Sequence, residues 1–153
     1  MKRKTLSKKE IKELNAEISG YGFEFDKKNA VAIEEDEKHK IVKSDNAICF
    51  FYQDNQIIPS LKMILDGKVM LKKITVDMGA VKFVVNGADI MRPGIVGIEE
   101  GIEKDNIIVI IDVNNKKPLA IGKAMYSSEE MESIEEGKVI KSLHFIGDKI
   151  WEL

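Results

Sequence analysis

The segment from residue 79 to residue 95 constrains the fold more than any other, because glycine occurs in it at positions 79, 87 and 94. Alternating apolar residues over 74–78 predict a strand before Gly79, and residues 80–86 provide about two helical turns before Gly87. We expect a strand, a tight corner, a short helix and a second corner. Without a Cβ atom, Gly79 and Gly87 can take a positive φ or admit another backbone or a ligand.

Arg92 precedes a further corner, which Pro93 and Gly94 predict from their turn preferences. This corner would direct the guanidinium out of the surface, where it suits a phosphate. The first amides of the short helix, beside Gly79, would also favour an anion, with Lys82 one turn further on. The alternative is that the two glycines serve packing alone and that Lys82 is a solvated surface residue.

A family resemblance rests on three short motifs in this segment: Gly79-Ala80 at the helix start, then Gly87-Ala88-Asp89, then Pro93-Gly94-Ile95. In this order they resemble the signature of the PUA domain, an RNA-binding module named after pseudouridine synthases and archaeosine transglycosylases. The chain is more specifically similar to archaeal and eukaryotic PUA proteins related to the malignant T-cell-amplified sequence protein. Further segments that carry this closer resemblance are 76–80, 118–124, 127–131 and 144–153. Residues 103–106 depart from the usual Lys-Gly-Asp turn, so we expect a different backbone shape there.

The resemblance implies an α+β protein with two domains, a mixed α+β pre-PUA domain over 1–72 and a mostly β PUA pseudo-barrel over 73–153. It also implies that the protein binds structured RNA without catalysis, either a tRNA acceptor end or small-subunit rRNA, and works in translation. The residues expected to bind RNA are Lys72, Lys73, Gly79, Ala80, Lys82, Asn86, Gly87, Ala88, Arg92, Pro93, Gly94 and Lys123. Related eukaryotic proteins work with a partner that carries initiation-factor-like domains, so an adaptor that docks such a translation factor onto the ribosome is the alternative.

The charge distribution complicates the RNA hypothesis, because the net charge of the 153 residues is -2. Residues 1–72 carry 14 basic against 12 acidic residues, and residues 73–153 carry 10 against 14. A protein that coats nucleic acid nonspecifically usually has a basic balance. RNA binding by the acidic half therefore requires its cations to gather on one face, with the acidic residues elsewhere.

In the N-terminal half, Ser7 and Glu10 form the pattern of a capping box, and Ile11, Leu14 and Ile18 follow at helical spacing. We expect this helix to stop at Gly20. Strands are predicted over 21–25, 30–33, 40–43 and 46–52, followed by a helix with Pro59 in its first turn. The first twelve residues hold six cations against one acid, which predicts either an RNA or ribosome contact or a solvated helix start.

In the C-terminal half, a long strand is predicted over 69–78, and a hairpin is predicted from 106–113 and 119–126 with a bulge at Gly122. A capped helix should start at Ser127, and strands should follow over 138–146 and 149–153. These elements make a small, mostly β barrel.

Motifs for chemistry are absent from the sequence. The two histidines, His39 and His144, have no zinc-ligand spacing to other residues, and Cys49 is the single cysteine. We therefore expect no enzyme activity, metal or cofactor, although an enzyme subunit completed by another chain is a further alternative. Apolar runs are too short for a membrane span, and we expect a cytoplasmic protein.

Overall fold

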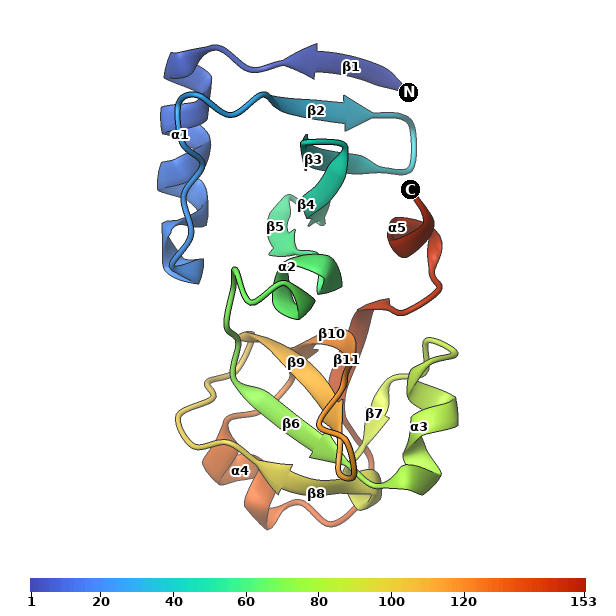
Figure 1. The fold of residues 1–153 in the computed structure, drawn as a ribbon. Coiled ribbons are helices and arrows are strands. Elements are labelled where there is room, and N and C mark those ends of the chain that lie inside the picture. Colours follow the sequence, from blue (N-terminus) through green and yellow to red (C-terminus); the bar gives the residue numbers. More distant parts are fainter. The chain divides into compact units, whose positions relative to one another are not determined.

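The computed structural model describes residues 1–153 and divides into two compact units, residues 1–70 with Leu153 and residues 71–152 (Figure 1). The N-terminal unit combines a sheet with helices, and the C-terminal unit is a nearly closed β barrel with short helices, which confirms the predicted fold class. No helix in either unit has both the length and the apolar character that crossing a bilayer requires.

The N-terminal unit is built on an antiparallel sheet of five strands in the order β1-β2-β3-β4-β5. The strands are β1 (Lys2–Thr5), β2 (Val31–Glu35), β3 (Lys40–Ser44), β4 (Ala47–Gln53) and β5 (Gln56–Pro59). The helices are α1 (Lys8–Ile18), the short 3-10 helix η1 (Ser19–Tyr21) and α2 (Leu61–Leu65).

Helix α1 begins as the sequence predicts. The Ser7 side chain accepts a hydrogen bond from the Glu10 amide, and the Glu10 side chain accepts one from the Ser7 amide. Ile11, Leu14 and Ile18 are buried on one face, which confirms the predicted apolar stripe. The predicted stop at Gly20 is wrong, because α1 continues into η1 and the residue with left-handed backbone is Gly22, at φ 71°. The chain needs a positive φ to leave the 3-10 turn, and Gly22 takes it without strain.

The strand predicted over residues 21–25 does not form. The Asn15 side chain binds the backbone of Phe25 instead, accepting from its amide at 2.7 Å and donating to its carbonyl at 2.9 Å. The rings of Phe23 and Phe25 meet edge to face, with centroids 5.0 Å apart, and both lie near Phe50. The alternating aromatic residues therefore pack in a cluster with Phe50 and do not form a strand.

The strands predicted over 30–33, 40–43 and 46–52 correspond to β2, β3 and β4 and are confirmed. The prediction for Pro59 is wrong, because Pro59 ends β5, paired with Phe50, and Ser60 is the residue that caps α2. The turn Asp54-Asn55, with φ angles of 50° and 64°, joins β4 to β5 in a tight hairpin. Proline is tolerated at this edge strand because the outer side of its backbone needs no ladder hydrogen bond.

Strand β1 was not predicted from the sequence. All four of its residues are polar and exposed, so the alternation of apolar and polar residues that indicates a strand is missing. It pairs with β2 and forms an edge of the sheet. Its cations are partly neutralised, since Arg3 binds Glu34 at 2.8 Å and Lys4 binds Glu10 at 2.5 Å. The basic N-terminus is therefore less cationic than its composition suggests, and its proposed RNA contact stays a hypothesis.

The C-terminal unit contains six strands in the order β7-β11-β10-β9-β6-β8, antiparallel except for the parallel pair β6 and β9. The strands are β6 (Lys73–Val76), β7 (Ile90–Met91), β8 (Ile95–Ile98), β9 (Ile107–Asp112), β10 (Pro118–Ala124) and β11 (Lys138–Phe145). The helices are α3 (Met78–Val84), the 3-10 turn η2 (Arg92–Gly94), α4 (Ser128–Ser133) and α5 (Lys149–Glu152).

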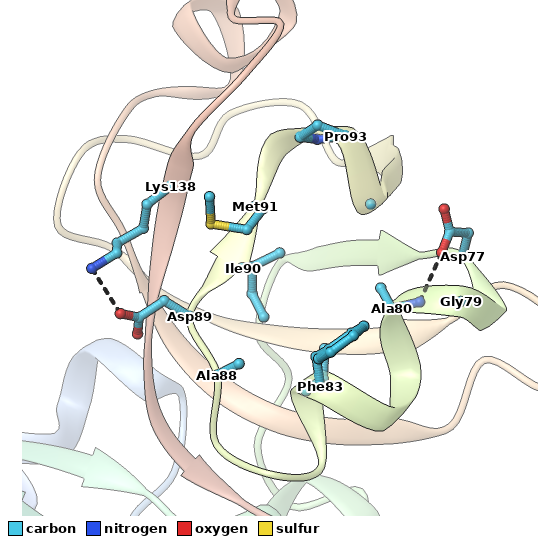
Figure 2. Close-up of a pocket in the computed structure, with 12 residues that line it drawn as sticks. Asp77, Gly79, Ala80, Phe83, Ala88, Asp89, Ile90, Met91, Pro93 and Lys138 are labelled. Atoms are coloured by element: carbon cyan, nitrogen blue, oxygen red, sulfur yellow. Dashed lines mark hydrogen bonds and ion pairs between the residues drawn. The ribbon is translucent and has the colours of Figure 1, made fainter.

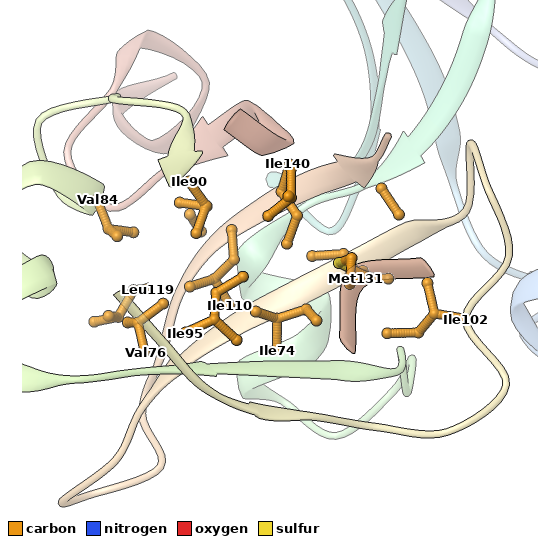
Figure 3. Close-up of a cluster of buried hydrophobic side chains, with 14 residues drawn as sticks. Ile74, Val76, Val84, Ile90, Ile95, Ile102, Ile110, Leu119, Met131 and Ile140 are labelled. Atoms are coloured by element: carbon orange, nitrogen blue, oxygen red, sulfur yellow. The ribbon is translucent and has the colours of Figure 1, made fainter. Parts of the chain in front are cut away.

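The barrel closes around a core made mostly of isoleucine and valine (Figure 3). Ile74, Ile110 and Ile140 come from three different strands and have no exposed surface, and Met131 of α4 joins them. Branched side chains pack well on pleated strands, which is why these runs of the sequence form the sheet. The core supports the elements that carry α3 and η2 on the outside of the barrel.

Local signals in this unit were largely correct. The hairpin of β9 and β10 is confirmed, as is the start of α4, where Ser127 and Glu130 form a capping box. Gly122 lies at a break in the register between β10 and β11, which confirms the bulge. A Cβ atom there would lie 2.6 Å from a methyl carbon of Ile140, so only glycine fits.

Two strand predictions in the C-terminal half are wrong. The strand predicted over 69–78 begins only at Lys73, because Val69 is buried in the N-terminal unit, where its amide donates to the Met63 carbonyl. The final residues form helix α5 rather than a strand. Its start is held by Asp148, whose carboxylate accepts hydrogen bonds from the amides of Trp151 and Phe145 and from Nδ1 of His144.

These contacts predict an acid-sensitive step in stability. Burial alone would raise the pKa of Asp148, but the hydrogen bonds from His144 and the two amides outweigh it and lower the pKa. The stability that this carboxylate contributes is fully present above its unfolded pKa of about 3.9 and is lost as the pH falls through the lower folded value. We expect Asp148→Asn to be less stable than the wild type at pH 7 and to lose less stability between neutral and strongly acid pH.

The measurement is urea unfolding followed by circular dichroism at a series of pH values, with Glu135→Gln on an exposed loop as the control. Parallel stability curves for the wild type and Asp148→Asn would contradict this role of the carboxylate.

Candidate functional site

A hollow of about 670 Å³ in the C-terminal unit, here called the α3 cleft, lies between helix α3, the segment 88–94 and the start of β11 (Figure 2). Its size is in the range of sites that hold small molecules. The residues that line it are Asp77, Gly79, Ala80, Phe83, Val84, Ala88, Asp89, Ile90, Met91, Pro93, Gly94 and Lys138. All of them except Asp77 and Lys138 come from the segment 79–95 that the sequence singles out.

One wall of the α3 cleft is set by a contact between the start of α3 and the turn η2. The Asp77 amide donates a hydrogen bond of 2.9 Å to the Gly94 carbonyl. A Cβ atom on Gly94 would lie 3.1 Å from the Cβ atom of Ala80, which is closer than side chains normally approach. Small residues at positions 80 and 94 therefore let the helix and the turn touch, and the hollow begins beside this contact.

The start of α3 is already occupied by a carboxylate of the chain. Asp77 is the capping residue, and its Oδ1 accepts a hydrogen bond of 2.9 Å from the Ala80 amide. Gly79 lies inside the helix with an ordinary φ, so the prediction that Gly79 forms the corner is wrong, and the corner lies at Asp77. A helix N-terminus attracts anions in general, but here Asp77 provides the negative charge.

Gly87 behaves as predicted, ending the turn after α3 with a φ of 87°. A Cβ atom at this position would lie 2.7 Å from the ring of Phe145, so the backbone here packs directly against β11. The interpretation of Gly87 as a packing glycine, which the sequence left open, accounts for this geometry.

The prediction that the Arg92 guanidinium leaves the surface is wrong. Its Nε donates a hydrogen bond of 2.8 Å to the Met131 carbonyl, its Nη1 donates one of 3.2 Å to the Ile95 carbonyl, and only 18% of the side chain is exposed. Met131 lies in the last turn of α4, and its carbonyl also accepts a hydrogen bond of 3.2 Å from the Ile134 amide at the end of the helix. Arg92 therefore connects α4 to β8 and serves the barrel.

The remaining predicted cations do not gather at the α3 cleft. Lys82 is exposed on α3 and lies 5.1 Å from the ring centroid of Phe83, outside the cleft lining. Lys72 lies 3.7 Å from Glu99. Five of the predicted residues line the cleft, namely Gly79, Ala80, Ala88, Pro93 and Gly94. Seven do not, namely Lys72, Lys73, Lys82, Asn86, Gly87, Arg92 and Lys123.

The walls of the α3 cleft are mainly apolar. Val84 and Ile90 are buried at its base, while the side chains of Phe83 and Met91 are 58% and 50% exposed. Large apolar side chains with this exposure are available to a ligand. Figure 2 shows Phe83 between the two polar ends of the cleft, with Asp77 at one end and Asp89 at the other.

Lys138 is the cationic residue of the α3 cleft and is not among the residues that the sequence predicts to bind RNA. It stands at the first position of β11, and its Nζ lies 2.9 Å from Oδ2 of Asp89. The Ser142 amide donates a hydrogen bond of 2.8 Å to Oδ1 of the same carboxylate. Burial would raise the pKa of Asp89, but these two hydrogen bonds outweigh it and lower the pKa, so the Asp89 carboxyl is ionised at neutral pH. No local pattern around Lys138 indicates its place, because the fold brings it to Asp89 from a distant part of the sequence.

Acidic residues of the C-terminal unit lie around a second hollow of about 510 Å³, which Glu100, Glu129 and Glu132 line together with Ile98, Gly101 and Ser128. The α3 cleft has only Asp77 and Asp89 as acids. Histidine, cysteine and carboxylate side chains nowhere form a group of three that could hold a metal ion. The structure thus separates many carboxylates from the cleft, although it does not concentrate cations there.

Two family models match the chain. Residues 72–146 match the model described as PUA domain, and residues 2–66 match the model described as domain of unknown function (DUF1947).

Similar proteins come from archaea and eukaryotes. An uncharacterized protein of Methanocaldococcus jannaschii is 38% identical over 154 residues, covering 98% of this chain and 95% of that protein. Translation machinery-associated protein 20 of Saccharomyces cerevisiae is 35% identical over 122 residues, covering 76% of this chain and 67% of that protein. Malignant T-cell-amplified sequence 1 of Rattus norvegicus is 29% identical over 132 residues, covering 83% of this chain and 72% of that protein.

Among solved structures, the crystal structure of a hypothetical protein from Pyrococcus horikoshii has the same fold along the whole chain. Its TM-score is 0.82 at 33% identity, and the match covers 99% of this chain and 98% of that one.

The inward position of Arg92 predicts a structural role. Arg92→Ala leaves the carbonyls of Met131 and Ile95 without this donor, and we expect it to lower the free energy of unfolding by about 2 kcal/mol. Lys82→Ala, a matched change of an exposed cation, should alter it by less than about 0.5 kcal/mol. Urea unfolding measures both variants. If the Arg92→Ala protein were as stable as the wild type, the structural role would be contradicted, and RNA binding would again be the expected role of the guanidinium.

Proposed function

The chain belongs to the family of proteins that join a DUF1947 domain, also called pre-PUA, to a PUA domain, and from this premise we propose that it is a noncatalytic RNA-binding protein of translation. The membership confirms the resemblance that the glycine motifs of residues 79–95 indicated. Relatives in this family carry the names translation machinery-associated protein 20 and malignant T-cell-amplified sequence 1. These names support the translation context, and the PUA domain supports RNA as the ligand class.

The observation that carries the proposal is the α3 cleft. Proteins that recognise single-stranded parts of RNA bind bases that are free of their stacks, commonly against an aromatic side chain. The cleft offers the half-exposed Phe83, an apolar floor and polar groups at its two ends. These features match a nucleobase, which has flat apolar faces and polar edges. We propose that an unpaired base of the RNA enters here.

This arrangement favours recognition by shape and stacking over broad contact with phosphates. Lys138 is the one cation in the cleft lining, and the net charge of the protein is -2. Each phosphate that a protein neutralises adds to the salt dependence of its affinity. The proposed complex therefore has a shallow salt dependence, and Lys82 remains a candidate for a phosphate contact on the outer side of α3.

The RNA partner we propose is a tRNA acceptor end or an unpaired site on small-subunit rRNA. Both present unstacked bases beside a structured helix, which a small cleft on a rigid barrel can bind. The predicted RNA-binding residues that line the cleft, Gly79, Ala80, Ala88, Pro93 and Gly94, would then act through the shape of the backbone rather than through charge.

The first test is the loss of the aromatic ring. Phe83→Ala removes the stacking surface without opening the core, since Phe83 is 58% exposed. Stacking of a base on an aromatic side chain is worth about 1–3 kcal/mol, so we expect RNA affinity to fall by roughly 5- to 150-fold. Fluorescence anisotropy with a labelled tRNA and with a labelled small-subunit rRNA fragment measures this change.

The matched control is Val96→Ala, because Val96 is an apolar residue of the same unit, 55% exposed and outside the cleft. Equal affinities of the wild type and Phe83→Ala for both RNAs would remove the α3 cleft from the binding site.

A second candidate function is the adaptor that binds a translation-factor protein. The observation that favours it is the exposure of two apolar residues of the N-terminal unit, Met70 at 82% and Leu65 at 44%. Exposed apolar groups of this kind are common at protein interaction sites.

Capture of partners from a cell extract, with and without ribonuclease, separates the two functions. We expect translation components to be lost after ribonuclease if RNA is the partner. Retention of one defined protein after ribonuclease, and its loss with Met70→Glu, would favour the adaptor.

A further inference from the structure

The pairing of Lys138 with Asp89 is the feature of the α3 cleft that the binding of a base does not explain. Figure 2 shows the Lys138 side chain reaching along the edge of the cleft to the Asp89 carboxylate, with 2.9 Å between Nζ and Oδ2. The Lys138 side chain is 50% exposed and that of Asp89 is 30% exposed. Both therefore meet solvent and any ligand that occupies the cleft.

The two partners of this ion pair are held with different strength. The Asp89 carboxylate has a second anchor, since its Oδ1 accepts a hydrogen bond of 2.8 Å from the Ser142 amide on β11. Lys138 has a long flexible side chain, and Asp89 is the acid to which it binds. If the pair opened, the Ser142 amide would still hold the Asp89 carboxylate, while the ammonium group of Lys138 would be free to move.

Opening the pair costs little, because exposed ion pairs contribute weakly to stability. A phosphate oxygen offers the ammonium group a charged acceptor in place of the carboxylate, and lysine binds phosphate as a mobile point charge. A base inside the α3 cleft would place its own phosphate at the rim, within reach of a side chain that already lines the cleft.

We propose that Lys138 binds the phosphate of the nucleotide whose base occupies the α3 cleft, and that Asp89 holds Lys138 at the rim while the cleft is empty. This inference rests on the proposed function, because it assumes a base in the cleft. It assigns the phosphate contact to a residue of β11 rather than to Arg92, whose guanidinium is bound to backbone carbonyls.

Asp89 has a second effect in this arrangement. A fixed carboxylate at the rim repels a phosphate that approaches from its own side, and it competes with that phosphate for Lys138. Asp89 therefore weakens the binding of anions in general, and the phosphate gains its place only when the base is bound as well.

The test compares adenosine with adenosine 5′-monophosphate, two probes that differ only in the phosphate. Binding is followed by the amide NMR signals of Phe83 and Met91 at low salt, for the wild type, Lys138→Gln, Asp89→Asn and the control Lys117→Gln. Lys117 is an exposed cation of the same unit outside the cleft. Unchanged amide spectra elsewhere in the barrel verify the fold of each variant.

We expect the monophosphate to bind the wild type about two- to fivefold more tightly than adenosine, the range that an exposed charge pair provides. Lys138→Gln should abolish this advantage, so that the monophosphate and adenosine bind the variant with equal affinity. Asp89→Asn should increase the advantage, since the competing carboxylate is neutral, and Lys117→Gln should not change it.

The outcomes separate this inference from the proposed function. If adenosine binds in the cleft but Lys138→Gln keeps the advantage of the monophosphate, the phosphate role of Lys138 is overturned and the base site stands. If neither probe shifts the signals of Phe83 and Met91 in the wild type, the base site and the role of Lys138 are both overturned.

Discussion

The hydrogen bond from the Asp77 amide to the Gly94 carbonyl, with Ala80 packed against Gly94, is the constraint on which the C-terminal site depends. It joins the end of β6 to the turn η2, so the helix that starts at Asp77 must leave along the outside of the barrel. A Cβ atom at position 94 would lie only 3.1 Å from that of Ala80, so any larger residue would force the helix and the turn to shift by a few tenths of an ångström. The α3 cleft is the space left where helix and turn diverge from this contact.

Charge in this unit is used mostly for structure. Arg92 binds the carbonyls of Met131 and Ile95, Asp77 caps α3, and Asp148 caps α5 while binding His144. Each of these groups makes hydrogen bonds to backbone amides or carbonyls, most of them at helix ends. What remains for a ligand is a mainly apolar cleft with one cation in its lining, Lys138, which is paired with Asp89. If RNA is the ligand, as we propose, this surface suits an unpaired base more than a string of phosphates.

Patterns of nearest neighbours in the sequence predicted the local structure well. The capping boxes at Ser7 and Ser127, the hairpin of β9 and β10 and the bulge at Gly122 all depend on residues a few positions apart, or on the missing side chain of glycine. The strand predicted from the aromatic alternation of 21–25 is wrong, because the side chain of Asn15, ten residues earlier, makes two hydrogen bonds to the backbone of Phe25. The strand predicted over 149–153 is wrong, because the hydrogen bonds of Asp148 to His144 and to the Trp151 amide favour a helical turn there over an extended strand.

For the site, the sequence by itself determined which segment forms it: glycines and alanines at 79–80, 87–88 and 94 permit close backbone contacts that larger residues would prevent. The tertiary structure alone decided what the charged groups do. Arg92 turns inward because its carbonyl partner Met131 arrives from 39 residues away, and Asp89 meets Ser142 across 53 residues while Lys138 joins it from the same strand. A long side chain points toward the hydrogen-bond partners that surround it, and the closure of the barrel, rather than neighbours in the sequence, decides which partners these are.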